Sequence, residues 1–214
     1  MRWTTEVHGG EVPILADDDP RQPVVVLAHG AGSHMEHKTM EWLAQIVRES
    51  GARVVRFNFL YRAQGRGMPD RMPTLIGTYE AVIDSVRKHL EVERLIIGGH
   101  SMGGRVASML LAQSHAADGL LLFGYPLHPP GQPEKLRDAH LAAIEVPTLQ
   151  LNGTEDEFCT RSIMEKIALP KQWTPHWIEG ADHSYSVRKT TGRTRPQVAE
   201  EIRETLTDWV SRKS

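Results

Sequence analysis

Short apolar runs alternate with helical stripes of apolar residues along most of the chain, and this alternation restricts the possible folds more than any other feature of the sequence. The runs at 24–27 and 95–97 are unbroken, as in strands that are covered on both faces. The segments 36–50 and 74–90 repeat apolar residues every three or four positions, which predicts helices. The pattern indicates an α/β fold with a mostly parallel, doubly wound sheet and helices on both faces.

The remaining segments continue this alternation. Two extended runs on either side of Gly9 and Gly10 predict an N-terminal β-hairpin. Further strands are predicted at 53–59, 120–123, 148–151 and 176–178, and further helices at 101–114, at 163–168 and from about residue 196 onward. A chain of 214 residues without a linker-like segment fits a single domain over residues 1–214.

The composition excludes several classes of protein. With 25 Lys and Arg against 27 Asp and Glu, the net charge is −2, which leaves no electrostatic footprint for binding nucleic acid. No apolar run approaches the ~20 residues of a membrane helix, and the first residues lack the apolar region of a signal peptide. Cys159 is the only cysteine, so no internal disulfide can form, and we expect a cytoplasmic protein.

Residues 98–104, directly after the predicted strand 95–97, read Gly-Gly-His-Ser-Met-Gly-Gly and contain the pattern G-x-S-x-G. A tight strand-to-helix turn of this kind holds the serine, here Ser101, in a strained conformation with its hydroxyl exposed. Gly99 and Gly103 have no side chain that could clash as the backbone doubles back. The alternative, a glycine-rich turn that grips a phosphate, lacks the spacing of the known phosphate-binding loops.

A second glycine-rich loop follows the first strand of the predicted parallel sheet and reads His-Gly-Ala-Gly from His29 onward. Such a loop after an early strand matches the one that donates the second N–H group of an oxyanion hole. The expected donors are the backbone amides of Ala31 and Met102, with His29 and Gly30 shaping the loop. His100 is expected to support the serine turn rather than act as a base, because neighbouring side chains in a turn point apart.

Two polar turns supply candidates for an acid and a base. The turn after the fifth predicted parallel strand contains Glu155, Asp156 and Glu157, and we expect Asp156 to orient the histidine. The turn after the sixth strand contains Asp182 and His183, and we expect His183 to be the general base. Asp182 is not predicted as the acid, because adjacent side chains usually diverge.

The chain order serine, aspartate, histidine is that of the α/β-hydrolases. On these residues the chain resembles the α/β-hydrolase superfamily from about residue 24 to the C-terminus. Within it, the chain resembles a small branch that includes a subunit of the NSL histone-acetyltransferase complex. The resemblance implies a serine hydrolase that cleaves a carboxylic ester, thioester or related acyl bond of a small substrate through an acyl-enzyme, without metal or organic cofactor. The alternative is a non-catalytic interaction or scaffold module on the same fold.

Residues that follow other strands are candidates for the substrate pocket. We expect the pocket wall to include Phe59, Tyr61, Arg62, Tyr125 and His128. Arg62 could meet a substrate carboxylate, although a solvated loop arginine is the simpler interpretation. The basic loop at 188–195 is more typical of a solvated connection than of an anion site. The sequence leaves the substrate itself and the oligomeric state open.

A metal site and a lid are two further features that the sequence disfavours. His29, His34, Glu36 and His37 lie within nine residues, and imidazoles and carboxylates bind zinc, but their spacing matches no known ligand motif. The segment between the strands at 120–123 and 148–151 contains several prolines and has room for a short helix around 134–143 at most. Many α/β-hydrolases insert a helical lid at this point, so we predict no lid domain and a comparatively open active site.

Overall fold

The N-terminal residues form the predicted hairpin, and the hairpin extends one edge of the sheet. The structure is a computed structural model that describes residues 1–114 and 116–212. Strand β1 (Arg2–Val7) pairs antiparallel with β2 (Gly10–Ala16), and β2 in turn pairs antiparallel with β4 (Arg53–Phe57). The hairpin is therefore part of the main sheet.

Parallel strands make up the rest of the sheet and bring their carboxyl ends to one edge. Neighbouring strands follow the order β1-β2-β4-β3-β5-β6-β7-β8. Every residue of β3, β4, β6 and β7 is buried, and in β3 and β6 this burial explains the unbroken apolar runs in the sequence. Besides β4, the parallel strands are β3 (Val24–Ala28), β5 (Leu95–His100), β6 (Gly119–Phe123), β7 (Thr148–Gly153) and β8 (Trp173–Ile178).

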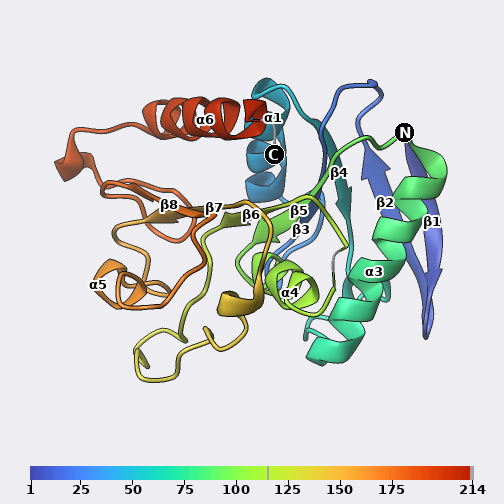
Figure 1. Cartoon of the computed structure of the whole chain (residues 1–214), viewed down its shortest axis with the longest axis horizontal. Helices are drawn as coiled ribbons and strands as arrows, with labels where there is room; N and C mark the ends of the chain where they lie inside the picture. Colours follow the sequence, from blue (N-terminus) through green and yellow to red (C-terminus); the bar gives the residue numbers. More distant parts are fainter. Residues whose placement is uncertain (115, 213–214) are drawn as a thin grey trace.

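Helices cover both faces of the sheet, as predicted (Figure 1). One face is covered by α1 (Lys38–Glu49) and α6 (Arg195–Ser211), whose apolar side chains form one core cluster with β3, β6 and β7. The other is covered by α3 (Met72–His89) and α4 (Met102–Leu111), which contribute to a second cluster. These two cores fix the sheet between the helices and so hold the strand ends in place.

The connection between β6 and β7 contains no lid domain. The short helix expected around 134–143 is a single 3-10 turn, Leu141–Ala143. Three other short elements complete the chain: α2 (Leu60–Ala63), α5 (Arg161–Met164) and a 3-10 turn at Lys189–Thr191. Among the described residues, no helix is both long enough and apolar enough to span a membrane.

Candidate active site

Ser101 lies in the tight turn between β5 and α4, in a backbone conformation that is rare for any residue with a side chain. Its φ is 53° and its ψ is −119°, and its backbone N–H donates to the Phe123 carbonyl at 2.9 Å. A Cβ atom at Gly99 or at Gly103 would lie 2.3 Å from the Ala28 carbonyl oxygen. The backbone of β3 therefore leaves room only for glycine on both sides of the serine.

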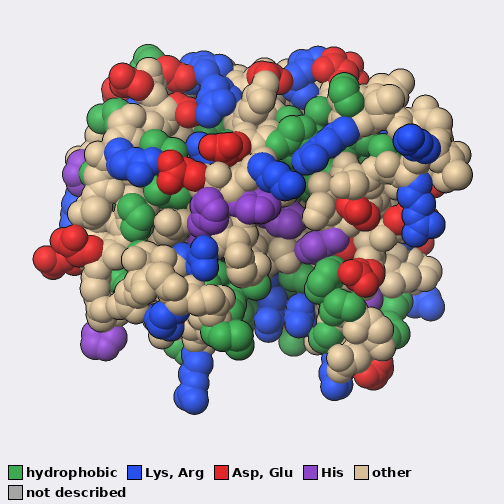
Figure 2. Space-filling model, turned by 180° about the vertical axis from the view of Figure 1, so that it is seen from behind, with side chains coloured by type: hydrophobic (Ala, Val, Ile, Leu, Met, Phe, Trp, Pro, Cys, Tyr) green, Lys and Arg blue, Asp and Glu red, His purple; other side chains and the backbone are tan. Residues whose placement is uncertain are grey.

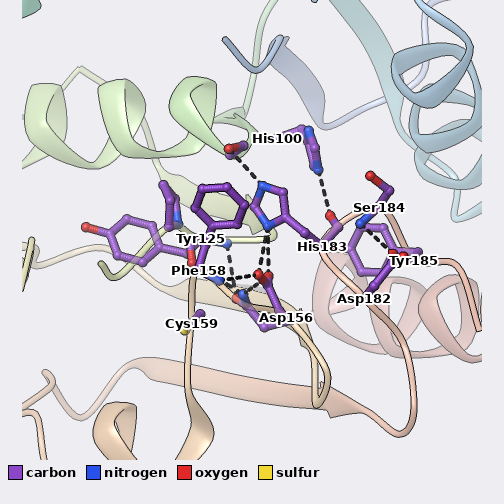
Figure 3. A network of polar contacts seen from close by, with 12 residues as sticks. His100, Tyr125, Asp156, Phe158, Cys159, Asp182, His183, Ser184 and Tyr185 are labelled. Atoms are coloured by element: carbon purple, nitrogen blue, oxygen red, sulfur yellow. Dashed lines mark hydrogen bonds and ion pairs between the residues drawn. The ribbon is translucent and has the colours of Figure 1, made fainter. Parts of the chain in front are cut away.

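The hydroxyl of Ser101 contacts His183. The His183 ring is held in turn by the buried carboxylate of Asp156 (Figure 3). The Ser101 Oγ lies 2.9 Å from His183 Nε2, and His183 Nδ1 lies 2.9 Å from each carboxylate oxygen of Asp156. Asp156 is 4 % exposed and accepts two further bonds, from Asn152 Nδ2 and from the Phe158 backbone N–H, both at 2.9 Å. With Nδ1–H donating to the carboxylate, the neutral imidazole presents Nε2 as an acceptor to the serine hydroxyl.

The structure gives no other acid of these two turns a contact with the His183 ring among the described residues. Asp182 Oδ1 accepts from the backbone N–H groups of Ser184 and Ser186, at 2.8 and 2.9 Å, so it stabilises its own turn. Glu157 is exposed, whereas Asp156 is buried beside His183. Of the acids in these two turns, the structure places Asp156 next to the imidazole.

The Ala31 and Met102 backbone amides are both near the serine. Gly30 and Ala31 line the same cavity as Ser101, and Met102 is the first residue of α4, directly after the serine. Within the described part of the chain, neither amide donates a hydrogen bond to another group. Two free N–H groups beside a nucleophile can bind a developing negative charge.

His29 ties the Ala31 loop to the end of β4. It is fully buried, and its Nε2 accepts from the Phe59 backbone N–H at 3.2 Å, while its Nδ1 lies 2.8 Å from the Gly30 carbonyl. Burial lowers the pKa of His29 from its ordinary value of 6.5 to about 4. The ring is therefore neutral at pH 7, with Nδ1–H donating and Nε2 accepting.

His100 contacts the loop that carries His183. Its Nε2 lies 3.0 Å from the His183 carbonyl, and the two rings are 5.1 Å apart. Burial is the main cause that lowers the pKa of His100 to about 4, and the adjacent His183 ring lowers it further. A neutral ring at pH 7 that donates to the His183 carbonyl joins the His183 loop to the serine turn.

An open cavity of about 350 Å³ lies in front of the serine. Its wall includes Ser101 and Phe158. It also includes three histidines, namely His37, His100 and His183. On the face shown in Figure 2, histidine side chains gather near the middle of the surface. Phe158 packs against the His183 ring, with 4.3 Å between the ring centroids. The site is therefore open to solvent and rich in imidazole groups.

The structure does not place the five expected pocket residues on this wall. Phe59, Tyr61 and Tyr125 are fully buried in the core, and His128 is 2 % exposed and lies 3.2 Å from the Thr160 hydroxyl. The Arg62 guanidinium donates to a neighbouring backbone carbonyl. Sequence reasoning missed other wall residues, namely Ser33, His37, Thr39, Phe158 and Ser184. The one feature of the sequence that could have identified them is that they lie in segments that follow the ends of predicted strands.

The residues weighed as metal ligands or as an anion site have other partners. Glu36 pairs with Arg2, and the His37 ring caps α1 by accepting from the Thr39 N–H at 3.2 Å. In the basic loop, Arg193 pairs with Glu201. Arg195 stacks on the Trp42 ring at 4.7 Å.

Comparison with known proteins assigns the chain to a family. A family model described as "Alpha/beta hydrolase domain" matches residues 21–211. The chain belongs to this family. The match covers all six parallel strands and the turns that carry the serine, aspartate and histidine. Membership of the family identifies the chain as an α/β-hydrolase.

Solved structures share the fold of this α/β-hydrolase over nearly the whole chain. A serine hydrolase without a lid from Xanthomonas campestris is 20 % identical, with a TM-score of 0.77, over 100 % of this chain and 96 % of the other. Est1E from Butyrivibrio proteoclasticus, solved with ferulic acid, is 16 % identical with a TM-score of 0.75, over 98 % and 100 %. A dienelactone hydrolase from Anabaena variabilis is 16 % identical with a TM-score of 0.70, over 98 % and 95 %. At these identities the likeness shows the shared fold.

Among curated proteins, proline iminopeptidase from Lactobacillus helveticus is 26 % identical over 104 residues. The match covers 48 % of this α/β-hydrolase and 34 % of the iminopeptidase. The aligned region is thus about a third of the length of that relative.

Proposed function

We propose that this α/β-hydrolase cleaves a carboxylic ester, thioester or related acyl bond of a small molecule through an acyl-enzyme on Ser101. The observation that carries the proposal is the continuous chain of contacts from the serine Oγ through the His183 ring to the Asp156 carboxylate, each 2.9 Å long. Family membership and the strained backbone of Ser101 support the same reading.

The geometry suits a two-step reaction. His183 Nε2 takes the proton of the Ser101 hydroxyl as Oγ attacks the substrate carbonyl, and the Ala31 and Met102 amides bind the resulting oxyanion. The imidazolium then gives its proton to the leaving group, and the acyl group remains on Oγ. A water molecule, deprotonated by the same nitrogen, attacks the acyl-enzyme, releases the acid and restores the serine. Asp156 holds the tautomer and stabilises the imidazolium throughout.

The alternative is a non-catalytic interaction or scaffold module on the same fold, because the branch that we take the sequence to resemble includes a subunit of the NSL complex. The intact contacts among serine, histidine and aspartate favour catalysis, because a scaffold has no use for them. We further infer that residues 1–214 act as one domain, since a single sheet runs from β1 to β8.

A fluorophosphonate probe tests the proposal, because it modifies only an activated serine. Wild type should be labelled, and Ser101→Ala should be neither labelled nor active on p-nitrophenyl esters, with a loss of at least ~10³-fold in kcat. Ser184→Ala, which removes another hydroxyl of the same cavity, should still be labelled. Equal labelling of wild type and Ser101→Ala, or labelling of neither, would overturn the proposal.

A further inference from the structure

His37 lies on the wall of the catalytic cavity and has no part in the steps proposed above. Its ring caps α1, because Nδ1 accepts from the Thr39 backbone N–H at 3.2 Å. A nitrogen that accepts a hydrogen bond carries no proton, so the neutral ring holds its proton on Nε2. Among the described residues, no group accepts a hydrogen bond from that nitrogen. The cavity wall therefore carries a fixed donor that lacks an acceptor.

The position of this ring is set by its neighbours. The cap bond joins it to α1, and the His34 ring packs against it edge to face, with 5.9 Å between the ring centroids. A ring held on two sides loses little further freedom when it binds a ligand, so a hydrogen bond from Nε2 costs little entropy. The donor is thus preorganised.

The other wall residues are small or polar. Hydroxyl groups of Ser33, Thr39 and Ser184 and the glycine-rich loop form much of the cavity. Among the described residues of the wall, Phe158 is the one large apolar side chain, and it packs on the His183 ring. Apolar atoms make up more of the exposed wall than polar atoms do, but their total area is small. A long alkyl chain would bury little apolar surface here and would gain correspondingly little binding free energy.

We propose that the cavity selects short substrates that carry an oxygen acceptor close to the scissile acyl bond, and that His37 Nε2–H donates to this oxygen. The inference rests on the proposed serine hydrolase and names the substrate class of that site. His37 is then a specificity-determining residue: it binds the substrate without taking part in proton transfer.

Matched pairs of esters in which an ether oxygen replaces one methylene group test this inference. On the acyl side the pair is p-nitrophenyl methoxyacetate and p-nitrophenyl butanoate; on the alcohol side it is 2-methoxyethyl acetate and butyl acetate. Each kcat/KM is divided by the rate constant for hydroxide-catalysed hydrolysis of the same ester, which removes the difference in intrinsic reactivity. The remaining ratio, oxygen over methylene, measures recognition of the oxygen by the protein.

His37→Ser is the informative variant, because serine keeps a side-chain cap on α1 but removes the imidazole donor. In at least one of the two pairs, wild type should prefer the oxygen ester, and His37→Ser should reduce this preference by about 3- to 10-fold, the loss of one hydrogen bond. The control is His8→Ser, which removes an exposed imidazole from the turn between β1 and β2, outside the cavity wall. It should leave both ratios within about twofold of wild type, well below the effect expected for one hydrogen bond.

The outcomes separate this inference from the proposed function. Ester turnover with no preference for oxygen in either pair, or with ratios that His37→Ser leaves unchanged, overturns the role of His37 alone. If p-nitrophenyl octanoate is a better substrate than the butanoate, the selection of short substrates is overturned, and the proposed function still stands. A wild-type protein that hydrolyses none of the esters and escapes the fluorophosphonate probe overturns the proposed function, and this inference with it.

Discussion

At the scale of single residues, the site combines one strained residue with several that hold it. Ser101 has a positive φ of 53°, and a side chain in such a conformation costs about 1–3 kcal/mol. The strain persists because the Phe123 carbonyl holds the serine amide and the glycines on either side lie against the backbone of β3. The Ser101 hydroxyl therefore lies where His183 Nε2 contacts it, 2.9 Å from Oγ.

Asp156→Asn tests which acid orients the imidazole. An amide can present its NH₂ group to Nδ1 and so favour the wrong tautomer, and we expect kcat for an activated ester to fall by about 10²- to 10⁴-fold. Asp182→Asn is the matched control, since its carboxylate accepts only from its own turn, and it should change kcat by less than threefold or so. Steady-state kinetics on p-nitrophenyl acetate measures both, and the reverse ranking would assign the acid to Asp182.

The five pocket residues show the limit of reading single residues from sequence. Phe59 and Tyr61 follow a strand end, which is where ligands bind in this class of fold. Position along the chain does not determine which way a side chain turns, and α2, only four residues long, carries no periodic signal. In the structure α2 directs Tyr61 into the core, while His37, from the loop after another strand, faces the cavity.

At the scale of secondary structure, the strands and helices were predictable because burial imposes a pattern on them. Strands covered on both faces need unbroken apolar runs, and β3, β5 and β6 have them. The residues at which the strands begin and end were less predictable. Strand β8 begins at Trp173, three residues before the predicted start, because its middle residues are exposed or half-buried and interrupt the apolar run.

Gly99→Ala tests the close packing of the serine turn against β3. The added Cβ would lie 2.3 Å from the Ala28 carbonyl oxygen, so the turn must shift, and we expect a loss of roughly 2–4 kcal/mol in the free energy of unfolding together with loss of activity. Gly77→Ala in α3 is the matched control. Its Cβ would meet nothing within 4 Å, and alanine should stabilise the helix by about 0.5–1 kcal/mol.

Urea unfolding followed by circular dichroism measures both glycine variants. A Gly99→Ala protein as stable as wild type would show that the turn can move away from β3 without cost. A Gly77→Ala protein less stable than wild type would show that the open space beside α3 is needed for another reason.

At the scale of the whole molecule, histidines that are neutral when folded, among them His29, His100 and His140, make stability depend on pH. The pKa values of His29 and His100 fall from 6.5 to about 4 on folding, because burial disfavours the charged ring. Between these values the unfolded chain binds protons that the folded chain does not, so each proton stabilises the unfolded state. These histidines therefore do not reduce the free energy of unfolding above pH 6.5, and they reduce it increasingly as the pH falls toward 4.

We expect the free energy of unfolding to decrease from pH 7 to pH 4.5, and the decrease to be smaller in His100→Gln, which cannot titrate there. Urea titrations at pH 7, 5.5 and 4.5 on both proteins measure the two slopes. Glutamine keeps an N–H donor for the His183 carbonyl, so the comparison isolates the titration. Identical slopes for the two proteins would mean that His100 binds protons equally in both states.

The short connection between β6 and β7 has a consequence for the timing of the reaction. Where a lid covers an active site, its opening and closing can limit turnover, and its movement can make activity depend on a lipid surface or a partner. Here a single 3-10 turn stands in that connection, and the cavity in front of the serine is already open. Substrate arrival and product departure need no rearrangement of this segment, so we expect that opening and closing of a lid does not limit turnover in the proposed reaction.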